Sequence, residues 1–293
     1  MRIATFADGR GARIGVLEGE AVRDVTAADP LLPKEMLALI AGGASLWQRL
    51  AAAANGPAPL LPLSAVRLLA PIPRPPRNSF CVGKNYREHA KEFASSGFDA
   101  TAKEVVPEAP VVFSKPPSSV IGPGEAIPSF LDPTASVDYE GELAVVIGTG
   151  GRGIAAADAM RHVFGYTIVN DVTARTLQHR HRQWLLGKGI DGFCPMGPAI
   201  LTADEVPDPG LMKLSTWVNG ALRQDARVAD LIFDIPTLIA TISAGITLEP
   251  GDIIATGTPA GVGIGFTPPR YLAAGDVVRI TVTGIGTLEN PVA

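Results

Sequence analysis

The stretch VDYEGEL, residues 137–143, runs directly into the apolar run AVVIG, residues 144–148. Acidic residues occupy every second position of the first segment, which is the period-two pattern of a β-strand. Side chains at positions i and i+2 lie on one face of a strand, so Asp138, Glu140 and Glu142 are expected to share a face. The apolar run that follows is typical of a strand buried on both of its faces.

Two interpretations of these acids are open. In the ordinary one, acidic side chains face water while the apolar side chains face the core. Gly141 instead favours close approach of another segment on the opposite face, and acids that enter a buried strand are costly unless a positive partner compensates them. Carboxylate oxygens suit a hard cation, Mg²⁺, Mn²⁺ or Ca²⁺, rather than zinc.

Asp171 offers a third carboxylate. It lies in YTIVNDVTARTLQ, residues 166–178, where an apolar strand meets a segment with a helical pattern. Taken alone, this aspartate is expected to be a helix N-cap. Together with Glu140 and Glu142 it would complete a set of three ligands that leaves coordination positions open for water and substrate.

Composition excludes several classes of protein. The chain has 293 residues, 46% of them hydrophobic, and a formal net charge of −4 without blocks of like charge, which argues against a nucleic-acid footprint or a polybasic membrane patch. No stretch reaches the ~18 apolar residues of a membrane span, and the N-terminus lacks a signal-peptide pattern, so a cytoplasmic protein is expected. Cys81 and Cys194 form neither a disulfide framework nor a metal motif.

The chain divides by pattern into residues 1–70, a small N-terminal unit with short strands and two helices interrupted at Gly42-Gly43, and residues 71–293. PIPRPP, residues 71–76, is the expected connector. The larger part has many strand-like runs and few helices, one of them opened by Asp234 as cap. Without alternating β and α units a doubly wound sheet is not expected, and the fold class predicted is β-rich α+β.

Other polar residues have two interpretations each. His89 and Glu92 lie three apart, so on a helix they form either a general base oriented by a carboxylate or an ordinary surface pair. Lys188, between two glycines, is either solvated or placed to stabilise an oxyanion. Gln178 follows Asp171 by two helical turns. Thr258 lies in TGTPAGVGIG, residues 256–265, which lacks the P-loop pattern and suits either a tight turn or close approach to a ligand carboxylate.

Six motifs in order resemble the fumarylacetoacetate hydrolase family. They are VGKNYREHAKE, VFSKPPSSVIGPG, VDYEGELAVVIG, GYTIVNDVTARTLQ, QWLLGKGIDGFCPMGP and LEPGDIIATGTPAGVG, spanning roughly residues 80–265. The resemblance implies a mixed β-sandwich roll with a small N-terminal α/β domain, a homodimer, and Mg²⁺ or Mn²⁺ at the carboxylate site. It implies no nucleic-acid or membrane partner.

The resemblance also implies roles for single residues. Glu140, Glu142 and Asp171 match the metal ligands, and His89 with Glu92 matches a water-activating dyad carried on a segment that orders over the substrate. The remaining matches are Lys188 and Gln178 on substrate oxygens, Thr258 in the carboxylate-binding loop, and Arg175 as support for the site. The family often has serine where this chain has Gly189, which bears on substrate choice.

The function implied is metal-dependent hydrolysis of a carbon–carbon bond in an acylpyruvate- or fumarylpyruvate-like 2,4-dioxo acid, in the breakdown of aromatic compounds. His89 and Glu92 favour a reaction that uses water. The alternatives are decarboxylation or isomerisation of a 2-oxo or hydroxymuconate-type acid, a ureidoglycolate-type lyase, and a non-catalytic metal- or ligand-binding protein. The segment Phe93–Pro110 is expected to select the acyl group as a lid.

Overall fold

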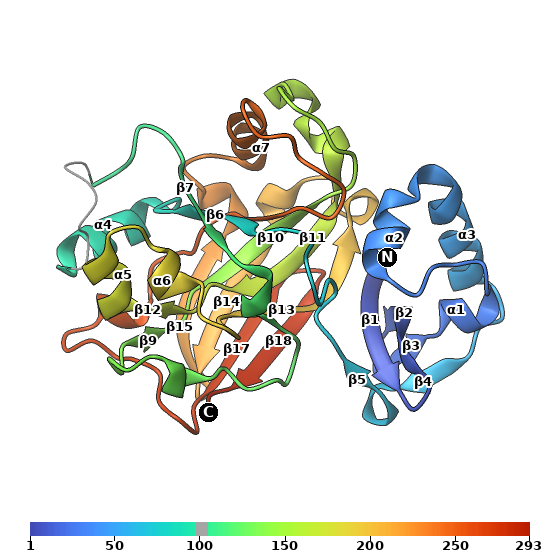
Figure 1. The fold of residues 1–293 in the computed structure, drawn as a ribbon, viewed down its shortest axis with the longest axis horizontal. Coiled ribbons are helices and arrows are strands. Elements are labelled where there is room, and N and C mark those ends of the chain that lie inside the picture. Colours follow the sequence, from blue (N-terminus) through green and yellow to red (C-terminus); the bar gives the residue numbers. More distant parts are fainter. Residues whose placement is uncertain (98–104) are drawn as a thin grey trace.

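One large mixed sheet of twelve strands runs through the molecule (Figure 1). The computed structural model describes residues 1–97 and 105–293. The path of the sheet is β4 (Leu60–Pro62), β3 (Ala21–Arg23), β2 (Gly11–Glu18), β1 (Arg2–Asp8), β13 (Cys194–Thr202), β11 (Val163–Asn170), β10 (Gly141–Ile147), β16 (Ile253–Ala255), β6 (Ser79–Gly83) and β7 (Val111–Lys115), with β5 (Arg67–Leu68) on β1 and β8 (Val120–Ile121) on β13.

A second, antiparallel sheet packs against the middle of the first. Its order is β15 (Ala221–Arg227), β14 (Lys213–Val218), β17 (Val277–Val282) and β18 (Gly286–Pro291). Leu143 and Val145 of β10 share a buried apolar cluster with Leu214 of β14 and Ile280 of β17. This packing makes the sandwich that the resemblance implies, and the predicted β-rich fold class is confirmed.

The other face of β10 is covered by N-terminal helices. Ala144 and Val146 lie in a second apolar cluster with Leu39 of α2 (Met36–Ala41) and Leu50 of α3 (Gly43–Asn55). Because successive side chains of a strand alternate between faces, β10 is buried on both sides, as its uninterrupted apolar sequence predicts.

The helices are few and short. They are α1 (Val25–Ala28), α2, α3, α4 (Arg87–Ser95), α5 (Arg175–His181), α6 (Leu185–Lys188) and α7 (Ile235–Ser243) in the described residues. The carboxylate of Asp234 accepts a hydrogen bond from the Thr237 amide at 2.9 Å, so the predicted cap of α7 is present. No helix in the described ranges has the length and apolar character needed to cross a bilayer.

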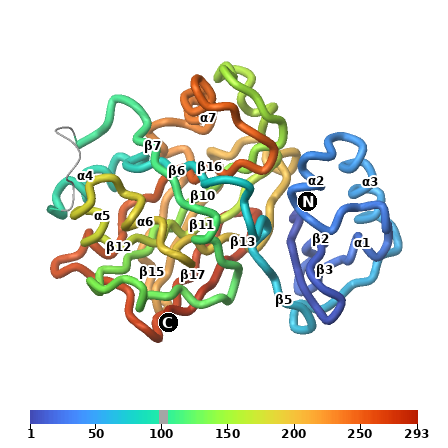
Figure 2. Tube along the Cα trace, viewed as in Figure 1, coloured from blue at the N-terminus to red at the C-terminus, as the bar shows by residue number. Residues whose placement is uncertain are grey.

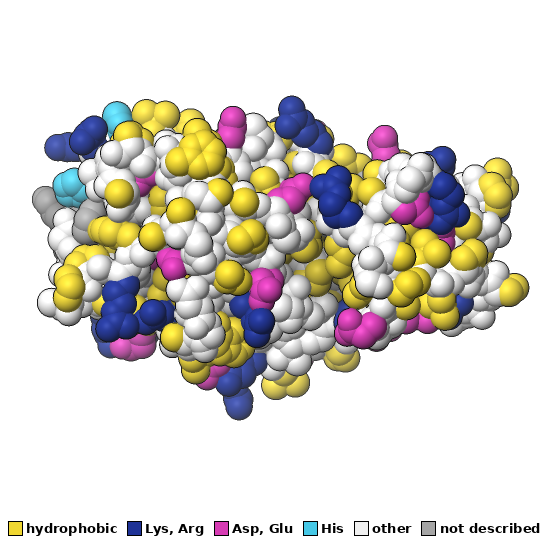
Figure 3. All heavy atoms as spheres, turned by 90° about the horizontal axis from the view of Figure 1, so that it is seen from below, with side chains coloured by type: hydrophobic (Ala, Val, Ile, Leu, Met, Phe, Trp, Pro, Cys, Tyr) yellow, Lys and Arg dark blue, Asp and Glu magenta, His cyan; other side chains and the backbone are white. Residues whose placement is uncertain are grey.

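The N-terminal strands continue the large sheet. Arg2 and Ile3 of β1 pair with Leu201 and Ile200 of β13, and Figure 2 shows the N-terminal residues in blue along one side of the larger body. The division at residues 70 and 71 remains a prediction. On the face drawn in Figure 3, basic and acidic side chains are interspersed among apolar ones rather than gathered by sign.

The acidic stretch is not one continuous strand. Val137–Asp138 form β9, which pairs with β12 (Thr173–Ala174), and β10 starts only at Gly141. The Asp138 carboxylate accepts hydrogen bonds from the Tyr139 and Gly263 amides, at 2.8 and 2.7 Å. These hydrogen bonds accompany a break in the strand between Asp138 and Gly141. The expectation of an unbroken alternating strand is therefore wrong at Tyr139 and Glu140.

Gly141 supplies a stability test of the contact between the sheets. A Cβ atom added there would lie 2.3 Å from the Thr216 hydroxyl oxygen and 3.2 Å from a methyl group of Ile280. Gly141→Ala should therefore lower the free energy of unfolding by about 1–3 kcal/mol through overpacking, measured by urea denaturation. Gly245→Ala, where an added Cβ meets no atom within 4 Å, is the control. Equal stability of the two variants would contradict close packing at Gly141.

Candidate functional site

Three buried carboxylates meet where β10 begins and β11 ends. Glu140, Glu142 and Asp171 each place an oxygen within 4.8 Å of the other two. Gly141 pairs with Asn170 at the end of the ladder, and the Asp171 amide donates to the Glu140 carbonyl at 2.8 Å. Two antiparallel strand ends therefore bring together residues that lie about thirty positions apart in the sequence.

Two cations compensate Glu140. The Lys188 ammonium lies 2.8 Å from Glu140 Oε2 and 2.6 Å from Asp171 Oδ2, and Arg175 Nη1 lies 2.7 Å from Glu140 Oε1. Burial raises the pKa of Glu140, but the charges of Lys188 and Arg175 lower it more, and the net pKa is below its ordinary value. Burial lowers the pKa of Lys188, but Asp171 and Glu140 raise it to a net value above the ordinary one. The solvated alternative for Lys188 is thus wrong.

Glu142 is compensated differently. Its hydrogen bond comes from the Gly257 amide at 2.9 Å, and it forms no ion pair with any residue that the structure describes. Burial, followed by the charges of Asp171 and Glu140, raises the pKa of Glu142 well above its ordinary value. A buried carboxylate without a counter-ion calls for a proton or a cation. The three carboxylates therefore fit a divalent cation with oxygen ligands, which Glu140, Glu142 and Asp171 would hold.

Asp138 does not join these three carboxylates. Its Oδ2 atom accepts from Arg175 Nε at 2.9 Å and from the Ile264 amide at 3.1 Å. Burial raises the pKa of Asp138 in spite of the Arg175 charge. The break in the strand at Glu140 separates Asp138 from the shared face on which the alternating pattern put it.

Helix α5 carries two further polar residues of the site. The helix starts at Arg175 after β12, so Asp171 is not its N-cap, and the two-turn spacing from Asp171 to Gln178 does not apply. Gln178 nevertheless lines the same cavity as Arg175, and its side-chain oxygen accepts from Arg175 Nη1 at 3.2 Å. Arg175 Nη2 is buried and has no hydrogen-bond partner in the described structure.

The histidine–glutamate pair on α4 is formed. His89 Nδ1 lies 3.1 Å from Glu92 Oε2, and Glu92 Oε1 accepts from the Gly261 amide at 3.0 Å. A Cβ atom at Gly265 would fall 1.9 Å from Glu92 Oε1. The glycine-rich segment of residues 256–265 thus closely approaches the helix, as expected for a ligand-facing loop, although the partner here is Glu92.

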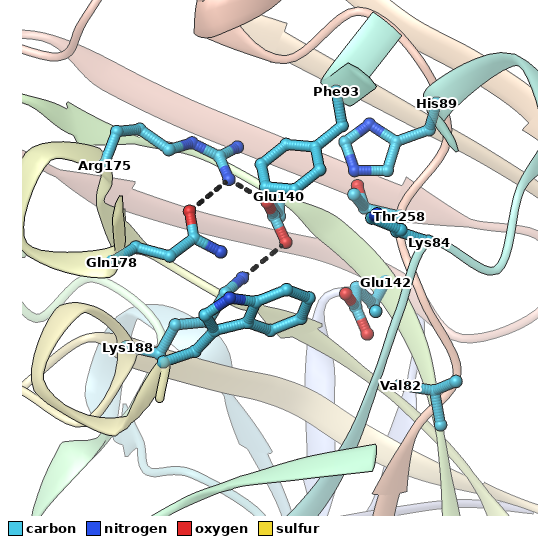
Figure 4. Close-up of a pocket in the computed structure, with 12 residues that line it drawn as sticks. Val82, Lys84, His89, Phe93, Glu140, Glu142, Arg175, Gln178, Lys188 and Thr258 are labelled. Atoms are coloured by element: carbon cyan, nitrogen blue, oxygen red, sulfur yellow. Dashed lines mark hydrogen bonds and ion pairs between the residues drawn. The ribbon is translucent and has the colours of Figure 1, made fainter. Parts of the chain in front are cut away.

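Figure 4 shows Glu140, Glu142, His89, Arg175, Gln178 and Lys188 around one cavity, with the Arg175–Glu140 and Lys188–Glu140 ion pairs drawn. Thr258 also lines the cavity. Its hydroxyl donates to the Gly141 carbonyl at 3.0 Å and accepts from Gln224 Nε2 at 2.7 Å. The hydroxyl proton of Thr258 is therefore already used within the protein.

Several residues of the site carry no assignment from sequence. Lys84 and Trp184 are two of them, and both line the cavity. Phe93, the first residue of the expected lid, lines it too, and its ring meets that of Trp184 edge to face with the centroids 6.1 Å apart. The Lys115 ammonium donates to Asp171 Oδ1. In the sequence this lysine is distinguished only by its place in the motif VFSKPPSSVIGPG. The expected lid, Phe93–Pro110, includes residues 98–104, which lie outside the described residues.

Gly189, the departure from the family pattern, is tightly packed. An added Cβ atom would lie 2.8 Å from the Leu185 carbonyl oxygen and 2.9 Å from Cδ of Pro116. A serine at this position would need the neighbouring backbone to move, which accounts for glycine here.

Comparison with known proteins agrees with this geometry. Residues 78–293 match the family described as fumarylacetoacetate (FAA) hydrolase, C-terminal. Oxaloacetate tautomerase YisK of Bacillus subtilis is 53% identical over 230 residues, 78% of this chain and 74% of the relative. The fumarylacetoacetate hydrolase structure from Exiguobacterium antarcticum has a TM-score of 0.85 and 44% identity, and covers 100% of this chain and 99% of its own. Maleylpyruvate hydrolase from Sphingobium sp. SYK-6, solved with manganese(II) and pyruvate, has a TM-score of 0.80 and 37% identity with the same coverage.

The uncompensated charge of Glu142 predicts opposite effects of one substitution. Metal-stripped Glu142→Gln should melt several degrees above the metal-stripped wild type, because the variant buries no lone carboxylate. A carboxyl group with a raised folded-state pKa loses stability as the pH rises above its ordinary value, so the gap should widen from pH 5 upward. Mn²⁺ at about 100 times its Kd should raise the melting temperature of the wild type by roughly 5–10 °C and that of the variant far less.

Thermal unfolding followed by circular dichroism measures both effects. Glu20→Gln, a change at an exposed glutamate, controls for the loss of one negative charge. A metal-stripped Glu142→Gln protein that melts at or below the wild-type temperature would contradict the uncompensated charge.

Proposed function

Because the chain belongs to the fumarylacetoacetate hydrolase family, we propose that this enzyme interconverts the enol and keto forms of oxaloacetate with the help of bound Mg²⁺ or Mn²⁺. The observation that carries the proposal is the set of buried carboxylates Glu140, Glu142 and Asp171, with Glu142 uncompensated. Glu140 and Glu142 line a cavity that His89 also lines. The 53% identity to an oxaloacetate tautomerase supports the choice of reaction.

The cavity suits a small dianion. Lys84, Arg175 and Lys188 line it, and Arg175 Nη2 has no hydrogen-bond partner among the described residues. A buried guanidinium nitrogen forms a strong, charge-assisted hydrogen bond with a carboxylate. We assign Arg175 Nη2 and the neighbouring Gln178 side-chain amide to one carboxylate of oxaloacetate.

The bound ion would act as a Lewis acid that polarises the oxygen at C2 of the substrate. Tautomerisation of the enol then requires that the C2 hydroxyl lose its proton and that C3 gain one, while the C2–C3 π pair becomes the new C3–H bond. His89 Nε2 is the ring nitrogen left over from the bond to Glu92, and it takes the hydroxyl proton and returns a proton to C3. Glu92 stabilises the imidazolium between the two transfers.

Lys188 contributes positive charge at the same oxygen. Its ammonium contacts Glu140 Oε2 and Asp171 Oδ2, the side-chain oxygens available to a ligated ion. If Glu140 and Asp171 held an ion, the Lys188 ammonium would be free to neutralise charge on the substrate oxygen.

Hydrolysis of a maleylpyruvate- or acylpyruvate-type acid is the second candidate. The His89–Glu92 pair, formed at 3.1 Å, is compatible with hydrolysis as well, because such a pair can activate water, and the similar Sphingobium enzyme is named a maleylpyruvate hydrolase. In that reaction His89 would take a proton from water instead of from the substrate hydroxyl.

The two reactions are separated by their products. Purified, metal-stripped protein with added Mn²⁺ should accelerate the loss of enol-oxaloacetate absorbance while total oxaloacetate stays constant. His89→Gln should lower kcat by about 10²-fold or more without changing Mn²⁺ affinity, whereas His162→Gln, remote on the surface, should keep wild-type kcat.

Each other outcome points elsewhere. Formation of pyruvate from maleylpyruvate or acetylpyruvate, without acceleration of the enol decay, would replace the proposal with the hydrolase. Conversion of oxaloacetate to pyruvate and carbon dioxide would replace it with a decarboxylase. Mn²⁺ binding without turnover of any of these acids would indicate a non-catalytic protein.

A further inference from the structure

Lys115, the last residue of β7, is a buried lysine to which neither the sequence nor the proposed reaction gives a role. Its side chain is fully buried. The ammonium lies 2.7 Å from Asp171 Oδ1 and 3.0 Å from the Val172 carbonyl oxygen, and it also donates to the Lys188 carbonyl oxygen. All three N–H bonds of the ammonium thus have an acceptor.

Two lysines share Asp171 from opposite sides. Lys115 binds Oδ1, and Lys188 binds Oδ2. Lys188 lines the cavity together with Glu140 and Glu142, whereas Lys115 is not among the cavity-lining residues. Oδ2 and Glu140 Oε2 thus share one ammonium, that of Lys188, whereas Oδ1 binds a lysine that is fully buried. An ion held by Glu140 and Asp171 would therefore compete with Lys188 and leave the contact with Lys115 in place.

The contact with the Lys188 carbonyl joins a second part of the site. Helix α6 has four residues and cannot fix its own position by backbone hydrogen bonding. Lys115 ties the last residue of this helix to the residue that follows Asp171. One ammonium thereby sets both the orientation of the Asp171 carboxylate and the place of the backbone that carries the Lys188 side chain.

We propose that Lys115 is a positioning residue. It restricts Asp171 to ligating a metal ion through Oδ2 alone, and it fixes the position of Lys188 relative to Asp171. This inference rests on the metal site of the proposed function. It opposes the simpler view in which Lys115 only offsets negative charge. The two views differ in sign, because removal of a nearby cation by itself strengthens the binding of a metal ion, whereas loss of an outer partner of a ligand weakens it, typically 10–100-fold.

The test is the affinity of metal-stripped protein for Mn²⁺, measured by isothermal titration calorimetry. Lys115→Met, which keeps the length of the side chain and removes the ammonium, should raise the Kd by 10–100-fold. Lys188→Met removes the same charge from the other oxygen of Asp171 and is the matched control, which should bind Mn²⁺ as tightly as the wild type or more tightly. Lys115→Gln, which retains a shorter hydrogen-bond donor, serves if Lys115→Met does not fold, and its Kd should also rise.

The outcomes are distinct. Wild-type or tighter Mn²⁺ binding by the Lys115 variants, with the wild type binding normally, overturns the positioning role and leaves the proposed function standing. Equal weakening in Lys115→Met and Lys188→Met overturns it as well, since the two oxygens would then be equivalent. Absence of Mn²⁺ binding in the wild type removes the metal site, and with it both the proposed function and the role of Lys115.

Discussion

Burial of four carboxylates at one end of β10 and β11 is the constraint on which the rest of this structure depends. Asp138, Glu140, Glu142 and Asp171 are all inaccessible to solvent or nearly so, and such charges are tolerated only beside cations and hydrogen-bond donors. Cations satisfy three of them. The fourth, Glu142, accepts a hydrogen bond from the Gly257 amide but forms no ion pair with a described residue. Its negative charge is therefore not balanced by the protein.

The compensating groups come from distant parts of the chain, which explains the architecture around the site. Lys115 ends β7, Arg175 begins α5, Lys188 ends α6, and the Gly257 amide follows β16. β7 and β16 are held in the large sheet, whereas the helices α5 and α6 have only seven and four residues and are too short to hold their positions alone. The large sheet supplies the fixed strand ends, and the ion pairs of Arg175 and Lys188 attach the short helices α5 and α6 to them.

The sequence predicts the β-rich fold well because strands depend on local pattern, whereas the roles of the site residues rest on the family resemblance and stay predictions. The apolar run 144–148 predicts a strand buried on two faces, and Gly141 predicts close approach of another segment, which the structure shows to be Thr216 of β14. The sequence does not predict the conformation of residues whose hydrogen-bond or ion-pair partners lie elsewhere in the chain. Asp138 has the same alternation as Glu140, yet its hydrogen bonds with residues 263 and 264 break the strand, and Lys188 lies in a glycine-rich stretch typical of a solvated lysine.

The wall of the cavity, rather than the carboxylates, distinguishes the two candidate reactions. Both place negative charge on the oxygen at C2, and His89 with Glu92 can serve either one, so the shared residues do not decide between them. What differs is the access of water. Phe93 and Trp184 line the cavity together with His89 and belong to an apolar cluster with Val262 and Ile264. Hydrolysis needs a water molecule placed between His89 and this apolar wall, whereas tautomerisation needs only proton transfers between His89 and the substrate. The apolar character of this wall is thus an argument for the proposed tautomerisation that does not depend on sequence similarity.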